Sequence, residues 1–227
     1  SSCAAIYGDN ADLENTARGV FTENDWNTTS SLTHNPYSYS KTVAEREAWK
    51  IADRQSQWEL VTINPSLVMG PGLNPNATSE SFNMIMQMGD GSQKRGAPGW
   101  GFGVVDVRDL ADAHLAAAFI PGATGRYIIS AHNTNLLAMA ATLLPKYGND
   151  YPIPRRPLPK WLIWLVAPMV APGITRRLVS RNFGYPWRGD NSRSVGELGM
   201  QYRPLAETMN DFFQQMVDNG RFGNGQA

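Results

Sequence analysis

Cysteine is nearly absent from the 227-residue chain, because Cys3 is the only one. A single cysteine cannot form an internal disulfide, so the composition favours a protein of the reducing cytoplasm. An excess of charge of one sign is also missing, since 20 Lys and Arg side chains balance 20 Asp and Glu side chains. That balance gives no electrostatic basis for binding nucleic acid.

Metal-ligand spacing and long apolar runs are missing as well. The three histidines, His34, His114 and His132, do not stand at zinc-ligand spacings from Cys3 or from carboxylates. The apolar run 161–171 has eleven residues, whereas a membrane-spanning helix needs about 20. The sequence therefore predicts neither a metal site nor a transmembrane segment.

Strand patterns and helix patterns alternate along the first 144 residues. Strands are predicted from short apolar stretches, at 1–7, 58–63, 103–107 and 126–130. Helices are predicted between and after them, at 38–55, 81–88, 110–119 and 136–144. This alternation predicts a parallel α/β sheet. Helical patterns dominate after Tyr151, which predicts a smaller helical lobe.

Tyr37 and Lys41 stand four residues apart at the start of a helical pattern. Residues at this spacing share one helix face, so an ammonium group is expected beside a phenol. A neighbouring cation lowers the pKa of a phenol from its usual value near ~10, which would allow proton exchange with an alcohol or carbonyl. The spacing alone is weak support, because a tyrosine packed on a lysine stem has the same pattern.

Several ordered motifs resemble those of the extended short-chain dehydrogenases/reductases, the NAD-dependent epimerase/dehydratase superfamily. Residues 1–8 resemble the end of the strand that carries their catalytic serine, and residues 37–49 resemble their Tyr-x-x-x-Lys helix. Residues 64–71 resemble the strand end that passes the nicotinamide. Later similarities lie at 106–114, 125–128 and 190–199. The helix motif is closest to the dihydroflavonol-reductase-like and aldehyde/ketone reductase branch.

The resemblance implies a Rossmann-like parallel sheet with a smaller, mostly helical C-terminal substrate lobe. It assigns 1–71 and 103–130 to the NAD(P)-binding domain, 72–102 and 131–219 to the substrate-binding lobe, and 220–227 to a flexible tail. The Gly-rich turn that receives the cofactor pyrophosphate in this family does not occur in the sequence. The sheet is therefore expected to lack its N-terminal strands, on the order of 100 residues of βαβ units, and the chain alone to be inactive.

The resemblance assigns catalytic roles to Ser2, Tyr37 and Lys41. Tyr37 would donate a proton to the substrate carbonyl oxygen while reduced nicotinamide supplies hydride, and Ser2 would stabilise the charge on that oxygen. Lys41 would hold the nicotinamide ribose. Cofactor contacts are expected from Tyr37, Lys41, Pro65, Ser66, Leu67, Val68 and Ser81. The cofactor is NADP or NAD, and the resemblance favours NADP.

These residues predict an NAD(P)-dependent oxidoreductase that reduces a ketone or aldehyde to an alcohol. A sugar-nucleotide epimerase or dehydratase and a hydroxysteroid-dehydrogenase-like enzyme remain open. Arg155, Arg156, Arg176 and Arg177 could bind the diphosphate of a sugar nucleotide, although a solvated basic face explains them more simply. A nucleotide-binding sensor without catalysis is a third alternative, which the complete catalytic set disfavours.

The apolar run 161–171 bears on the substrate. A core helix is the preferred interpretation, an apolar lid over the substrate is the second, and an interfacial helix flanked by basic residues is the third. The expected partner is a small, apolar or aromatic carbonyl compound. A helix-paired homodimer is one arrangement that the resemblance allows.

Overall fold

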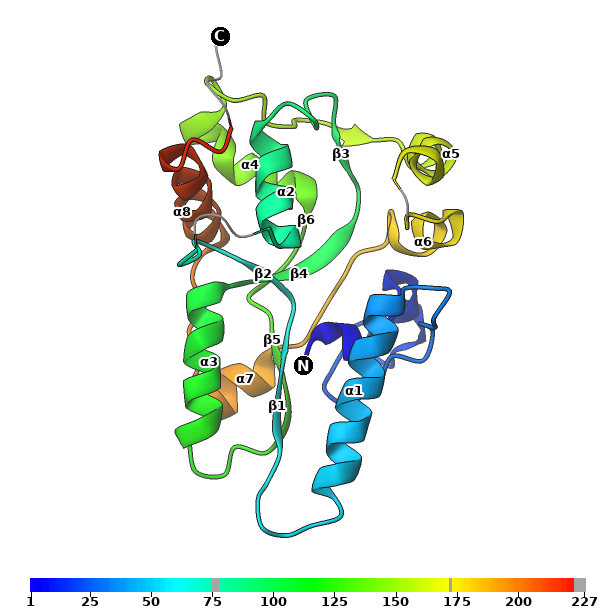
Figure 1. The fold of residues 1–227 in the computed structure, drawn as a ribbon, viewed down its shortest axis with the longest axis vertical. Helices are drawn as coiled ribbons and strands as arrows, with labels where there is room; N and C mark the ends of the chain where they lie inside the picture. The colour runs from blue at the N-terminus through cyan, green and yellow to red at the C-terminus, as the bar shows by residue number, and fades with distance from the viewer. Residues whose placement is uncertain (75–77, 172, 223–227) are drawn as a thin grey trace.

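The N-terminal part of the protein consists of short helices followed by one long helix. The computed structural model describes residues 1–74, 78–171 and 173–222 (Figure 1). Two 3-10 helices, Cys3–Ala5 (η1) and Asn10–Asn15 (η2), precede the long helix Pro36–Ala52 (α1). Helix η1 packs against α1 and against the first strand.

Within the described residues, seven strands form three small sheets. Their bounds are Val61–Pro65 (β1), Leu67–Met69 (β2), Ala97–Pro98 (β3), Gly101–Asp106 (β4), Gly125–Ile129 (β5), His132–Asn135 (β6) and Pro157–Leu158 (β7). The pairs β1–β5, β2–β4 and β3–β7 are parallel, and β4–β6 is antiparallel. Strand β6 follows β5 after two residues, but it pairs with β4 and not with β5.

In the part of the chain that the structure describes, seven further helices surround these strands and bury the core. Their bounds are Glu80–Gly89 (α2), Val107–Phe119 (α3), Leu136–Tyr147 (α4), Lys160–Val170 (α5), Arg176–Asn182 (α6), Ser192–Leu198 (α7) and Leu205–Asp218 (α8). One core cluster lies between α2, α4, α8 and strands β2 and β4, and a second between α3, α7, β1 and β5 (Figure 1). The mixed α/β architecture predicted from the sequence is confirmed.

The predicted strand at residues 1–7 is wrong. Ser2 has an extended backbone, but its hydroxyl oxygen accepts a hydrogen bond from the Ala4 amide at 3.1 Å, and its carbonyl accepts one from the Ala5 amide at 2.9 Å. Serine side chains cap helical turns in this way, which offers the backbone an alternative to a strand ladder.

The preferred prediction for the apolar run 161–171, a core helix, is wrong for its outer face, which is exposed. Only Ile163 of α5 is buried, where it packs with Val179 and Phe183. On the outer face, Trp161 is 67% exposed and Met169 is 80% exposed. Among the helices that the structure describes, none combines the length and apolarity that crossing a bilayer requires.

The predicted tail at 220–227 falls mainly on residues 223–227, which lie outside the described residues. Phe222, the last described residue, stacks on Phe213 of α8 with ring centroids 4.6 Å apart. The described part of this segment therefore packs on the core that α8 helps to form.

Candidate active site

The start of α1 is fixed by the loop that precedes it. Asn35 adopts a left-handed conformation with φ of 56°, which asparagine tolerates better than most residues, and Pro36 follows at the first helical position. The Asn35 side-chain amide donates to the Gly8 carbonyl at 2.8 Å. The helix therefore begins directly beside the loop that follows η1.

Tyr37 and Lys41 lie next to each other on the first turns of α1. The Lys41 ammonium nitrogen is 5.6 Å from the centroid of the Tyr37 ring. The Tyr37 side chain is 61% exposed, so its hydroxyl can be reached by a ligand. The structure thus provides a phenol with a cation beside it, on a surface that is open to solvent.

The segment of Ser2 lies against both α1 and the end of β1. The Asn64 side-chain amide donates to the Ser2 carbonyl at 3.1 Å, and the Cys3 thiol donates to the Asn64 carbonyl at 3.1 Å. Thr42 of α1 makes a longer contact, 3.4 Å, with the Ala4 carbonyl. These contacts bring the predicted serine segment to the Tyr37–Lys41 helix.

The predicted cofactor residues fall in two places. Pro65 ends β1, the Ser66 amide donates to the Ile129 carbonyl at 3.1 Å, and Leu67 and Val68 belong to β2. All four are half-buried, and Pro65 and Ser66 lie at the carboxyl ends of β1 and β5, the kind of position where α/β sheets bind ligands. Ser81 instead stands on α2, whose buried face packs against α8 and β2.

A buried polar hub holds α1 against the sheet, and the sequence-based reasoning did not identify it as part of the site. Glu45 on α1 accepts from the Arg126 guanidinium at 2.6 Å, from the Asn64 amide at 2.7 Å and from the Ser1 hydroxyl. Arg126 also lies 3.9 Å from the centroid of the Trp26 ring. Burial alone would raise the pKa of Glu45, but the bonds to Ser1, Arg126 and Asn64 hold it below its usual value.

A second hub joins α6 to the loop before Tyr37. The buried Asp9 carboxylate accepts from His34 at 2.9 Å, from the Arg181 guanidinium at 2.6 Å and from the Asn182 amide at 2.7 Å. Burial opposes the charge, yet these three partners lower the pKa of Asp9. Asp9 therefore connects α6 to the loop that precedes the candidate active-site helix α1.

The two hubs predict a loss of stability in acid. A carboxylate whose pKa is lowered by folding contributes its full stabilisation above its usual pKa, which is 4.5 for Glu45 and 3.8 for Asp9. This contribution disappears as the pH falls through the folded-state pKa. The free energy of unfolding should therefore decline from about pH 4.5 downward. Urea denaturation at a series of pH values would test this.

Glu45→Gln provides the comparison for that series, because the amide does not titrate. Its free energy of unfolding should depend less steeply on pH over the same range than that of the unaltered protein. Equal slopes for the two proteins would show that Glu45 is not a source of the acid sensitivity.

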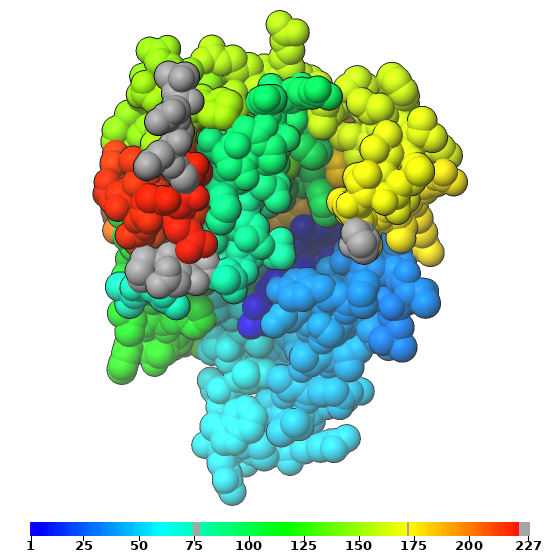
Figure 2. All heavy atoms as spheres, turned by 45° about the horizontal axis from the view of Figure 1, so that its top comes forward, coloured from blue at the N-terminus to red at the C-terminus, as the bar shows by residue number. Residues whose placement is uncertain are grey.

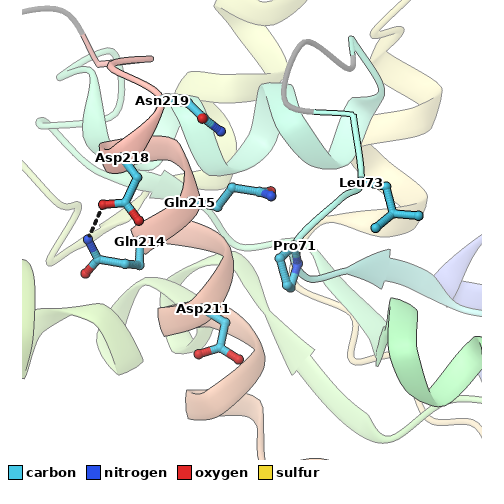
Figure 3. A pocket seen from close by; sticks show the side chains of 7 residues that line it. All are labelled: Pro71, Leu73, Asp211, Gln214, Gln215, Asp218 and Asn219. Atoms are coloured by element: carbon cyan, nitrogen blue, oxygen red, sulfur yellow. Dashed lines mark hydrogen bonds between the residues drawn. The ribbon is translucent and has the colours of Figure 1, made fainter.

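Two surface cavities help to delimit the site. A groove of about 410 Å³ is lined by Lys41, Ala44 and Ala48 of α1 and by residues 60–63 at the start of β1. A separate pocket of about 550 Å³ lies between α8 and the loop after β2 (Figure 3). None of the predicted catalytic residues lines that second pocket.

The pocket of Figure 3 has a polar wall from α8. Gln215 ties the wall to the opposite loop, because its side chain donates to the Gly72 carbonyl at 2.7 Å and accepts from the Gly72 amide at 2.9 Å. Asp211 and Asp218 are the two acidic side chains. Among the described residues, no group of three or more His, Cys, Asp or Glu side chains could hold a metal ion.

Comparisons with known proteins identify the family to which the chain is similar. A sequence model of the NAD dependent epimerase/dehydratase family matches residues 1–126. Cinnamoyl-CoA reductase 1 of Arabidopsis thaliana is 35% identical over 162 residues, which are 69% of this chain and 44% of that enzyme. Dihydroflavonol 4-reductase of the same plant is 29% identical over 159 residues, 63% of this chain and 38% of that enzyme.

Solved structures show the same relationship in three dimensions. The structure of Gre2 from Candida albicans in complex with NADPH superimposes on this chain with a TM-score of 0.69 and is 25% identical to it in sequence. The match covers 96% of this chain and 63% of the Gre2 chain. The chain spans less than half the length of either plant reductase. The family match extends over more than half of the chain, and the chain therefore belongs to the NAD dependent epimerase/dehydratase family.

Proposed function

We propose that the protein is an NADP-dependent reductase that converts a ketone or aldehyde to an alcohol. The observation that supports this most is the exposed Tyr37 side chain, with the Lys41 ammonium 5.6 Å from its ring centroid, next to the segment that contains Ser2. A phenol with a neighbouring cation is suited to donate a proton to a carbonyl oxygen. The similarity to plant reductases and to the NADPH complex of Gre2 supports the cofactor and the reaction class.

The residues fit the nicotinamide half of such a cofactor. Lys41 and Tyr37 offer donors to a ribose hydroxyl, and the half-buried backbone from Pro65 to Val68 offers a surface beside them. When bound, NADPH supplies the hydride that reduces the carbonyl carbon. Tyr37 then gives its hydroxyl proton to the carbonyl oxygen, and the phenolate recovers a proton from solvent. The Ser2 hydroxyl stabilises the developing negative charge on that oxygen by donating a hydrogen bond.

The sugar-nucleotide alternative required four arginines that could bind a diphosphate, and the structure weakens that requirement at one of them. The Arg155 guanidinium already donates to the Gly148 carbonyl at 2.7 Å, so one of the four arginines has a partner on its own surface. The proposal places the enzyme in the cytoplasm, in keeping with the single, buried Cys3. The proposal also includes a homodimer, which is supported only by the similarity to the family.

A substrate panel tests the reaction class. NADPH oxidation by the whole protein should be seen with at least one aromatic carbonyl, such as a cinnamoyl thioester, a dihydroflavonol or an aromatic aldehyde. The same panel with NADH should react more slowly. Conversion of a UDP-sugar without net consumption of cofactor would replace the proposal by an epimerase, and NADPH binding without turnover of any compound would replace it by a sensor.

A further inference from the structure

One segment of this electrically neutral chain is strongly basic. Residues 151–189 contain seven Lys and Arg and no Asp or Glu, although the whole chain has 20 of each sign. The seven are Arg155, Arg156, Lys160, Arg176, Arg177, Arg181 and Arg188. Four of the seven, Lys160, Arg176, Arg177 and Arg181, belong to α5 and α6, which pack on each other at one corner of the molecule (Figures 1 and 2).

The same corner exposes an apolar stripe. Trp161, Leu165 and Met169 stand at positions i, i+4 and i+8 of α5 and are 67%, 48% and 80% exposed. This spacing places the three side chains on one helix face. Trp164, which is 39% exposed, borders them. The face is therefore a continuous apolar surface whose back, at Ile163, is packed on α6.

Cations border the stripe directly. The Arg176 guanidinium lies 4.6 Å from the centroid of the Trp164 ring, and Arg177 beside it is exposed. Neither forms an ion pair with any of the described residues, whereas Arg181 on the same helix pairs with Asp9 and Asp12. The charge next to the stripe is thus left uncompensated, unlike the charge that fastens α6 to the N-terminal loop.

We propose that the stripe of Trp161, Trp164, Leu165 and Met169 (the α5 stripe) binds the surface of an anionic lipid bilayer. Tryptophan favours the interface between water and acyl chains, and apolar side chains beside cations are typical of helices that lie in that interface. Arg176 and Arg177 then contact lipid phosphate groups. Because α5 has eleven residues, it lies in the plane of the interface and does not cross the bilayer.

Charge also argues against a second copy of the chain as the occupant. In a two-fold symmetric dimer the same patch meets itself, so pairing through the α5 stripe would bring the Arg176–Arg177 groups of both copies together. Like charges in that arrangement oppose association, whereas a bilayer containing phosphatidylserine supplies the opposite charge. The negative surface of a cytoplasmic leaflet therefore matches this corner of the molecule.

Vesicle sedimentation tests the proposal with the whole protein. The protein should pellet with vesicles of phosphatidylcholine containing one-quarter phosphatidylserine, pellet much less with phosphatidylcholine alone, and be released by high salt. Tryptophan fluorescence should shift to shorter wavelength on binding. Trp161→Gln combined with Met169→Gln should lower the partition coefficient by about tenfold or more, and so should Arg176→Gln combined with Arg177→Gln.

A matched control comes from α3. Leu115 and Phe119 are also exposed apolar residues four apart on a helix, at 59% and 79%, but lie outside the basic segment. Leu115→Gln combined with Phe119→Gln should leave the partition coefficient unchanged, and circular dichroism should confirm that every variant is folded. The proposal is overturned if the protein does not bind anionic vesicles, if the α3 and α5 variants lose binding equally, or if the α5 variant instead abolishes a dimer.

Discussion

Replacing Tyr37 by phenylalanine should lower kcat for carbonyl reduction by about 10²–10⁴-fold, which is the usual contribution of a positioned proton donor. The ring remains and only the hydroxyl is lost, so the contact with the Lys41 ammonium, 5.6 Å from the ring centroid, can persist. Because Tyr37 is 61% exposed, the loss of its hydroxyl should hardly change the free energy of unfolding. Steady-state kinetics of the whole protein with NADPH and the best carbonyl substrate would measure the effect.

Two measurements separate loss of the proton donor from loss of binding. Fluorescence titration should show NADPH bound by Tyr37→Phe with a Kd within a few-fold of the unaltered protein. Tyr39→Phe is the matched control, because Tyr39 lies two residues further along α1 and should keep nearly full activity. Undiminished turnover by Tyr37→Phe with cofactor bound would rule out Tyr37 as the proton donor.

The architecture could be predicted where a local pattern decides the structure. Short apolar runs mark β1, β4 and β5 because buried parallel strands are apolar on both faces. The turn at η1 could not be predicted in this way, since a serine cap replaced a strand ladder that the apolar composition alone would allow. The antiparallel pairing of β6 likewise depends on how the chain turns after β5, which the apolar pattern does not encode.

In the candidate site too, local patterns could be predicted and contacts between distant residues could not. Tyr37 and Lys41 could be predicted because their spacing is set by one helix. The hub of Glu45, Asn64 and Arg126 was missed because its partners are far apart in sequence, with Glu45 and Arg126 81 positions apart. The sequence did contain one indication of a buried Glu45. It follows Ala44 directly, and Ala44 and Ala48 are small residues of α1 that line the same groove as the start of β1. An acidic residue there requires a buried partner.

For α5 the error was the reverse, because burial was predicted for a helix face that is exposed. An apolar run predicts burial only if another element covers it, and the described structure places α6 on one side of α5 alone. Composition cannot distinguish a helix that is covered on all sides from one that is covered on half of them.

Replacing Arg126 by methionine should lower the free energy of unfolding by about 3–5 kcal/mol, the usual cost of removing one partner from a buried ion pair. The Arg126 and Glu45 side chains are only 8% and 1% exposed, so water cannot replace the lost partner. The substitution also removes donors to the carbonyls of Glu23 and Asp25, at 2.7 and 2.6 Å. Urea denaturation at pH 7 would measure the change.

The matched control for this prediction lies on the same helix. Glu47 pairs with Lys50 at 2.6 Å, but both side chains are more than half exposed, so Glu47→Gln should cost about 0–1 kcal/mol. Glu45→Gln in the Arg126→Met background should recover part of the stability, because it removes the unpaired buried charge. If Arg126→Met costs no more than Glu47→Gln, the buried pair does not hold α1 on the sheet. If it does cost more, the position of Tyr37 and Lys41 depends on a contact that lies one turn further along their own helix.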